Sequence, residues 1–237
     1  MSTAAPAVAL RGLRFAWPGT PRPCLEIDAF ELAAGERVFL HGPSGSGKTT
    51  LLSLIGGVLD PDAGHVAVHG QELGALHAGA RDRFRADHIG FVFQLFNLIP
   101  YLSARDNILL PCRFSRARRA RIAAAGGDPA AEAARLAARL DLQAALLDHP
   151  AAELSVGQQQ RVAAARALIG RPPLVIADEP TSALDADRQR GFLDLLLAEC
   201  AQAGAALLFV SHDGRLAEHF DRVVALGELN RVAGEAA

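Results

Sequence analysis

The chain has 237 residues, of which half are apolar and 21% are charged, and its formal net charge at pH 7 is −2. This length allows one large domain or two small ones, and the apolar content excludes an intrinsically disordered chain. The nearly neutral charge gives no basic surface of the kind that nucleic-acid-binding proteins carry, so we expect no nucleic-acid partner.

The apolar stretches of the sequence are short. The longest, at residues 51–59 and 203–210, do not reach the roughly 18 residues that suggest a transmembrane helix. Residues 1–11 lack the basic start and apolar centre of a signal peptide. The three cysteines are widely spaced, which favours buried thiols in a reducing compartment over a disulfide framework or a zinc site. We therefore expect any membrane role to come through a partner.

In chain order, alternating or short apolar stretches predict strands. Residues 8–15 predict the first strand, and a turn-rich connection begins at residue 17. Further strands are predicted at residues 38–40, 64–69, 88–93, 174–177 and 206–210, with helices after residue 48 and across residues 103–168. Strands that alternate with helices indicate an α/β fold with a parallel sheet, into which the long helical region is inserted.

A glycine-rich loop lies between the strand at 38–40 and the helix that follows. Residues 42–49 match the pattern GxxxxGK[ST], in which backbone N–H groups and the helix N-terminus surround phosphate oxygens. Lys48, the single lysine of the chain, reaches the β- and γ-phosphates, and the Thr49 hydroxyl ligates Mg²⁺. An ordinary glycine-rich turn is the alternative. The predicted phosphate-binding residues are Gly42, Pro43, Ser44, Gly45, Ser46, Gly47, Lys48, Thr49 and Thr50.

Two carboxylates follow the apolar strand at 174–177. Ligands of parallel sheets bind beyond the carboxyl ends of the strands, so we expect Asp178 and Glu179 to face the phosphate loop. Asp178 suits the Mg²⁺ shell through water, and Glu179 suits a general base that polarises an attacking water. An acidic turn before Pro180 is the alternative.

A second helix start, at residues 154–161, reads Leu-Ser-Val-Gly-Gln-Gln-Gln-Arg. Ser155 and Gln158 fit a capping box, and the free N–H groups beside Gly157 form a second anion site. One chain rarely needs two γ-phosphate sites at separate helix starts, whereas two chains facing head-to-tail use both.

These motifs, together with Gln94, residues 182–185 (Ser-Ala-Leu-Asp) and His212, stand in the order typical of ABC ATPases, which the chain resembles over nearly its whole length. The resemblance implies a single ATPase domain over 1–237. It has a P-loop NTPase core with a parallel sheet, an antiparallel β subdomain, and a helical subdomain at about 95–170. This subdomain carries the signature motif, residues 154–158, at the start of the signature helix. It also implies a dimer in which each ATP lies between one chain's phosphate loop and the other chain's signature helix.

The resemblance further assigns roles to single residues. Gln94 contacts Mg²⁺ and the attacking water, and His212 holds the γ-phosphate and orients Glu179. Asp185 helps to join the two sites. Trp17 falls where the family places an aromatic residue that stacks on adenine. The alternative is that Trp17 is an ordinary residue of the hydrophobic core.

One position departs from the family pattern. The usual LSGGQ is here Leu-Ser-Val-Gly-Gln, with Val156 in place of a glycine. A β-branched residue is tolerated in a first helical turn. We expect a modest loss of ATP turnover and not inactivity.

Other segments keep two interpretations. The apolar residues 94–102 are either buried or form a groove for a helix of a membrane partner. The stretch at 93–111 resembles the lipoprotein-release and macrolide-efflux branch. The arginine run at 113–121 is either a solvated helix face or a contact with anionic lipid headgroups.

The sequence is therefore interpreted as a subunit that binds and hydrolyses ATP with Mg²⁺ to power a membrane ABC transporter through dimer closure. The expected partners are a second ATPase subunit, identical or paired, and integral-membrane permease subunits that hold the chain at the cytoplasmic face of the inner membrane. The alternative is an ABC complex that transports no solute and transmits force to a periplasmic partner. A soluble ABC ATPase of DNA repair or translation is disfavoured, because no long coiled-coil insertion or second ATPase unit is present.

Overall fold

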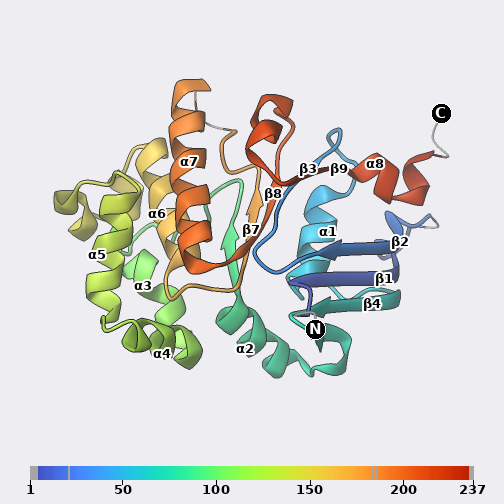
Figure 1. Cartoon of the computed structure of the whole chain (residues 1–237), viewed down its shortest axis with the longest axis horizontal. Coiled ribbons are helices and arrows are strands. Elements are labelled where there is room, and N and C mark those ends of the chain that lie inside the picture. The colour runs from blue at the N-terminus through green and yellow to red at the C-terminus, as the bar shows by residue number, and fades with distance from the viewer. Residues whose placement is uncertain (1–4, 21, 183, 185, 235–237) are drawn as a thin grey trace. The chain divides into compact units, whose positions relative to one another are not determined.

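The computed structural model of the chain describes residues 5–20, 22–182, 184 and 186–234. It consists of two compact units, one formed by Met1–Arg85 with Ala206–Ala237 and the other by Ala86–Ala205 (Figure 1). Among the described helices, none combines the length and apolar character needed to cross a membrane.

The first unit contains an antiparallel sheet with the strand order β2-β1-β4-β5. Along β1 (Val8–Phe15) buried residues alternate with exposed ones, which is the pattern of a strand with one face in a core. β1 pairs with β2 (Leu25–Leu32) on one side and β4 (Ala63–Val68) on the other, and β4 pairs with β5 (Gln71–Glu72). The antiparallel β subdomain is thus present.

The first unit also contains three parallel strands, with β3 (Arg37–His41) between β8 (Ala206–Val210) and β9 (Arg222–Ala225). Every residue of β8 is buried, as expected for a parallel strand covered on both faces. Phe39 of β3 stacks on Phe209 of β8, with ring centroids 6.1 Å apart. The remaining elements of this unit are α1 (Lys48–Ile55), η1 (Leu73–Ala75), η4 (Gly214–His219), α8 (Leu226–Leu229), η5 (Arg231–Gly234) and α2 (Ala78–His88), which continues past Arg85 into the second unit.

The second unit contains two parallel strands, β6 (Ile89–Val92) and β7 (Leu174–Asp178), and most of the helices (Figure 1). Gly90 of β6 lies against α6, since a Cβ there would be 2.3 Å from the carbonyl oxygen of Ala167. Its helices are α3 (Ala104–Phe114), α4 (Arg116–Ala124), α5 (Pro129–Arg139), η2 (Ala144–Asp148), η3 (Ala151–Glu153), α6 (Val156–Leu168) and α7 (Ala186–Ala203).

The arginine run of α3 and α4 is not a uniformly solvated face. Arg118 is only 2% exposed, and its guanidinium donates hydrogen bonds to four backbone carbonyls, those of Ala86, Ile89, Ala167 and Ile169. Burial lowers the pKa of Arg118 to about 10, so the side chain is still charged at neutral pH. The solvated-face interpretation is therefore wrong for Arg118, which instead satisfies carbonyls at the end of α6.

Candidate functional site

The phosphate loop lies in the first unit, between the end of β3 and the start of α1. Gly45 and Gly47 have φ angles of 79° and 98°, a region that residues with a Cβ rarely adopt. A Cβ on Gly47 would also lie 2.9 Å from a Leu25 methyl group. The ammonium of Lys48 donates to the carbonyl oxygens of Gly42 at 2.8 Å and Pro43 at 2.9 Å, which folds the side chain back over its own loop.

The loop has the polar groups that a phosphate would satisfy. No side chain caps the start of α1, so the first N–H groups of this helix have no side-chain acceptor at the N-cap. The buried hydroxyl oxygen of Ser46 has no hydrogen-bond partner among the described residues. The first turn of α1 also contains no acidic residue that would repel an anion. These features fit a phosphate and argue against an ordinary turn.

Trp17 and His212 are the other predicted site residues of the first unit. The Trp17 ring is 46% exposed and meets Phe15 edge-on at 5.2 Å, so the core-filling interpretation is wrong. His212 is exposed just after β8. Its neighbour Asp213 accepts hydrogen bonds from Arg215, which lower the pKa of Asp213 to about 2. The sequence patterns did not predict this Asp213–Arg215 ion pair.

The acidic strand end lies in the second unit. Asp178 and Glu179 are 6% and 8% exposed, at the carboxyl end of a strand in which every residue is buried. Glu179 has a φ of 46°, a left-handed conformation that is strained for a residue with a Cβ. The segment after it is tied to α6, because the Gln160 amide donates to the Pro180 carbonyl at 2.6 Å. A plain acidic turn does not require this buried, strained backbone.

The predicted capping box at the start of α6 is confirmed. The Ser155 hydroxyl accepts from the Gln158 N–H, and the Gln158 side chain accepts from the Ser155 N–H at 2.8 Å. Val156 is 51% exposed and occupies the first helical position. Beside this helix start is a hollow of about 500 Å³, lined by Ser155, Val156, Gly157, Gln158, Gln160, Arg161, Leu184, Arg188 and Phe192. Asp185, the remaining predicted ATP-site residue, lies outside the described residues.

Gln94 is exposed and lies in a turn that follows β6. The turn is closed by a hydrogen bond from the Phe96 N–H to the Phe93 carbonyl at 2.9 Å. Phe96 and Asn97 then adopt left-handed conformations in succession, with φ angles of 60° and 49°. Both of their carbonyls accept hydrogen bonds from Arg166 of α6, a residue that the sequence reasoning did not single out.

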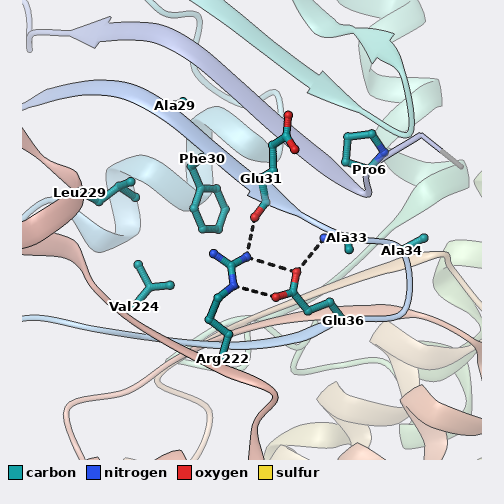
Figure 2. Close-up of a pocket in the computed structure, with 10 residues that line it drawn as sticks. All are labelled: Pro6, Ala29, Phe30, Glu31, Ala33, Ala34, Glu36, Arg222, Val224 and Leu229. Atoms are coloured by element: carbon teal, nitrogen blue, oxygen red, sulfur yellow. Dashed lines mark hydrogen bonds and ion pairs between the residues drawn. The ribbon is translucent and has the colours of Figure 1, made fainter. Parts of the chain in front are cut away.

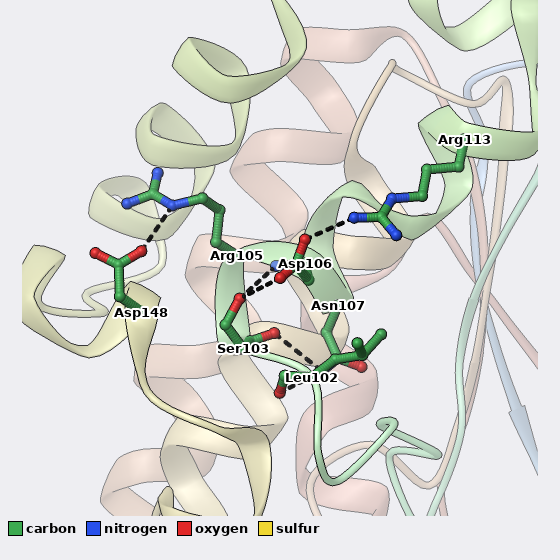
Figure 3. A network of polar contacts seen from close by, with 7 residues as sticks. All are labelled: Leu102, Ser103, Arg105, Asp106, Asn107, Arg113 and Asp148. Carbon is green, nitrogen blue, oxygen red and sulfur yellow. Dashed lines mark hydrogen bonds and ion pairs between the residues drawn. The ribbon is translucent and has the colours of Figure 1, made fainter.

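The rest of this segment is held by Asn107, a fully buried residue of α3. Its amide donates to the carbonyls of Ile99, Leu102 and Ser103, and its side-chain oxygen accepts from the Ile99 N–H at 2.8 Å. Figure 3 shows Asn107 beside Leu102 and Ser103, within the polar network of this region. Helical periodicity shows which face of α3 carries Asn107 but not which backbone groups its side chain bonds. These hydrogen bonds could therefore not be predicted from the sequence.

The apolar residues of the 94–102 segment divide between core and surface. Phe96 is 8% exposed, whereas Leu95 and Tyr101 are 83% and 80% exposed. The burial interpretation is therefore wrong for Leu95 and Tyr101, the large side chains that face solvent in the structure.

A further hollow, of about 800 Å³, lies in the first unit away from the predicted residues (Figure 2). Arg222 donates to both carboxylate oxygens of Glu36 and lies 5.6 Å from the Phe30 ring centroid. Burial raises the pKa of Glu36, but hydrogen bonds from Arg222 and the Ala33 N–H outweigh it and the pKa is lowered. The polar groups of this hollow thus pair with one another, and its described lining includes none of the predicted site residues.

Taken together, the parallel α/β fold, the phosphate loop and the capped second helix start define a nucleotide-binding ATPase subunit. The ABC transporter family model matches residues 25–182, and the chain belongs to this family as the subunit that binds and hydrolyses ATP. Its fold is accordingly the ABC ATPase fold that the sequence predicts.

Relatives agree with this assignment. The chain is 42% identical to the lipoprotein-releasing system ATP-binding protein LolD of Pseudomonas fluorescens, over 86% of both chains. It is 43% identical to the uncharacterized ABC transporter ATP-binding protein YbbA of Escherichia coli K12, over 84% of this chain and 85% of the relative. The dimeric post-hydrolysis structure of the ATP-binding cassette MJ0796 bound to ADP and Pi superposes with a TM-score of 0.82 at 34% identity, covering 92% and 93% of the two chains.

Proposed function

We propose that two copies of this chain, or one copy and a paired ATPase subunit, bind two ATP molecules head-to-tail and close to drive a membrane permease. One observation carries the proposal: the chain has two helix starts suited to anions, the uncapped α1 after the phosphate loop and the start of α6 beside its hollow. A single ATP needs one phosphate loop, so the second helix start suits the γ-phosphate of a nucleotide held by another chain.

Within each site, this chain's own residues have distinct tasks. Lys48 and the loop N–H groups bind the β- and γ-phosphates, while Ser155, Gly157 and Gln158 present N–H and hydroxyl donors to the partner's nucleotide. Trp17 stacks on the adenine ring, which its 46% exposure permits. Asp185 is the last of these residues, and it helps to join the two ATP sites of the dimer.

Thr49, Gln94 and Asp178 offer hydroxyl, amide and carboxylate oxygens, the hard donors that Mg²⁺ prefers, with Asp178 acting through water. When bound, Mg²⁺ neutralises charge that develops on the phosphate oxygens. Glu179 accepts a proton from the attacking water, and His212 orients that carboxylate and holds the γ-phosphate. The strained backbone at Glu179 fixes the direction of its carboxylate.

The partner in the membrane is proposed to be a permease of the lipoprotein-release type, as the LolD relatives suggest. Leu95 and Tyr101 supply exposed apolar surface beside Gln94, which suits a helix of such a permease. This arrangement holds the chain at the cytoplasmic face of the inner membrane.

A Glu179→Gln variant tests the ATP-driven pairing. The amide cannot accept the proton, so hydrolysis stops while ATP still binds, and we expect a dimer on size exclusion with ATP and a monomer without it. The matched Glu218→Gln variant, altered at an exposed glutamate, should hydrolyse ATP normally. Absence of an ATP-dependent dimer in Glu179→Gln would exclude closure as the mechanism.

Co-purification from membranes tests the partner. Native chain should carry integral-membrane permease subunits, identified by mass spectrometry, and a Leu95→Asp, Tyr101→Asp double variant should lose them. Val58 is 61% exposed in the first unit, so Val58→Asp is a control for added surface charge and should keep the permease. Equal recovery from all three proteins would contradict docking at the 94–102 segment.

A further inference from the structure

We propose that Arg166 is a positioning residue that acts through Gln94: from α6, it fixes the backbone immediately after Gln94 and so links the signature helix to the turn that presents this glutamine. The inference rests on the proposed function of Gln94 at the attacking water. It assigns to Arg166 a task that neither the motif pattern nor the likeness to known cassettes specifies.

The first observation is the unusual backbone after Gln94. Phe96 and Asn97 both have left-handed φ angles, 60° and 49°, and neither is a glycine. Such conformations persist in residues with a Cβ only where surrounding contacts enforce them. The turn that contains Gln94 ends at Phe96, whose N–H bonds the Phe93 carbonyl. Whatever holds Phe96 and Asn97 therefore also holds the end of the turn that presents Gln94.

The second observation is that Arg166 holds both residues. Its guanidinium donates to the Phe96 carbonyl and, at 2.7 Å, to the Asn97 carbonyl. Arg166 is 9% exposed and, among the described residues, forms no ion pair with a carboxylate. Burial lowers its pKa to about 10, so it is charged at neutral pH and these hydrogen bonds are charge-assisted. The buried guanidinium charge of Arg166 thus stabilises the carbonyls of the two residues with left-handed φ angles, Phe96 and Asn97.

The third observation is the position of Arg166 in the fold. It belongs to α6, the helix whose first turn carries Ser155 and Gly157. Helices move as rigid elements, so a displacement of the signature end of α6 reaches the Gln94 turn through Arg166. Asn107 holds the far end of the same segment at Ile99, which leaves the Gln94 end as the part that Arg166 controls.

Arg118 provides a natural comparison. It is also a buried arginine whose guanidinium donates to backbone carbonyls, including those of Ala167 and Ile169 at the end of α6. Among the described residues, it forms no hydrogen bond to the Gln94 turn. An Arg118→Ala variant therefore reports the effect of losing a buried arginine of the same unit without releasing Phe96 and Asn97.

Hydrogen exchange without nucleotide tests the contact directly. Arg166→Ala should raise the exchange rates of the Phe96 and Asn97 N–H groups by about tenfold or more, while Arg118→Ala leaves them within about threefold of wild type. Arg166→Lys, which keeps a donor of the same charge, should restore part of the protection and serves if Arg166→Ala does not fold. Unchanged exchange on loss of Arg166, or an equal rise in Arg118→Ala, would overturn the proposal.

A double-mutant cycle tests whether Arg166 acts through Gln94. We expect Arg166→Ala to lower kcat at saturating ATP and Mg²⁺ by about tenfold with the KM for ATP changed less than about threefold. The Gln94→Ala, Arg166→Ala double variant should lie within about threefold of Gln94→Ala alone. Independent, multiplying losses would overturn the positioning role. If the wild-type chain hydrolyses no ATP, the proposed function fails, and hydrogen exchange still decides whether Arg166 holds the turn.

Discussion

Lys48 is the single lysine among 24 basic residues, and its ammonium lies within the phosphate loop on the carbonyls of Gly42 and Pro43. An ammonium is a compact charge on a flexible stem, whereas a guanidinium is a wide planar group. We predict that Lys48→Arg lowers kcat for ATP hydrolysis by about 100-fold or more, although charge is preserved. Phosphate release measures the loss. Arg139→Lys, the reverse exchange at an arginine whose side chain is 56% exposed, should retain activity, and a fully active Lys48→Arg would contradict the phosphate role.

Val156 is the second residue with a specific consequence. Its side chain is 51% exposed at the start of α6 and lines the hollow beside the signature motif. Removing it lets a phosphate approach the helix start more closely, so Val156→Gly should raise ATP turnover by less than about tenfold. Glycine also loses more backbone freedom on folding than valine does, so the variant should unfold at a slightly lower temperature, which thermal unfolding measures. A rise far above tenfold would show that valine impairs the native site severely.

At the scale of elements, Glu199 joins α7 to α5. Its side chain is 4% exposed and accepts hydrogen bonds from Arg135 at 3.0 Å and Arg139 at 2.9 Å. Burial raises the pKa of Glu199, but the two arginines outweigh burial and the pKa is lowered. A lowered folded-state pKa means stability that is present above the unfolded-state pKa and is lost as pH falls through the folded-state value.

Glu199→Gln should therefore lower the free energy of unfolding at pH 7 by about 1–3 kcal/mol, because the charged hydrogen bonds to both arginines weaken. The difference from wild type should shrink as pH falls below the ordinary glutamate pKa of about 4.3 toward the lowered folded-state value, because the native carboxylate becomes protonated there. Denaturant unfolding at pH 7 and at a series of pH values below about 4.3 measures both effects. A pH-independent difference would mean that packing and not ionisation makes the contribution.

The elements that sequence patterns predicted best are those with continuous apolar character. The strand expected at 206–210 is β8, Ala206–Val210, and the strand expected at 174–177 is β7 without its last residue, Asp178. Apolar strands and capping chemistry are local, which also explains why the capping box at Ser155 was predictable. The helical region at 103–168 divides into separate helices, since Gly126 and Asp141 interrupt it in left-handed conformations.

The missed residues share one physical cause. Arg118, Arg166 and Asn107 are buried polar side chains whose partners are backbone carbonyls. For the two arginines these carbonyls are far away in the sequence, and for Asn107 they lie in the irregular segment just before its helix. Helical spacing shows on which face a residue lies but not which carbonyls lack a partner there. In the sequence alone, Asn107 therefore cannot be distinguished from any other polar residue within an apolar stretch. The motif residues were predictable because their chemistry depends on neighbours in sequence.

For the whole molecule, the proposed head-to-tail pairing makes a prediction that no single-chain mechanism shares. Lys48→Ala removes the phosphate loop's charge and leaves the signature helix intact. Ser155→Asp leaves the phosphate loop intact and disables the signature helix. Aspartate still caps α6, but its negative charge repels a γ-phosphate. Each variant alone should lose nearly all ATPase activity, whereas Ser155→Thr, which keeps the hydroxyl and the cap, should stay active.

When the two inactive variants are mixed in equal amounts, half of the pairs that form are mixed pairs. In a mixed pair, the intact phosphate loop of one chain meets the intact signature helix of the other, so one of the two sites is restored. If the sites act independently, activity should return to about a quarter of wild type and increase with protein concentration, because pairing must precede hydrolysis. Phosphate release across a dilution series measures this. A mixture no more active than its separate components would place both anion-binding helix starts on the same nucleotide, or in sites that must both be intact before either hydrolyses ATP.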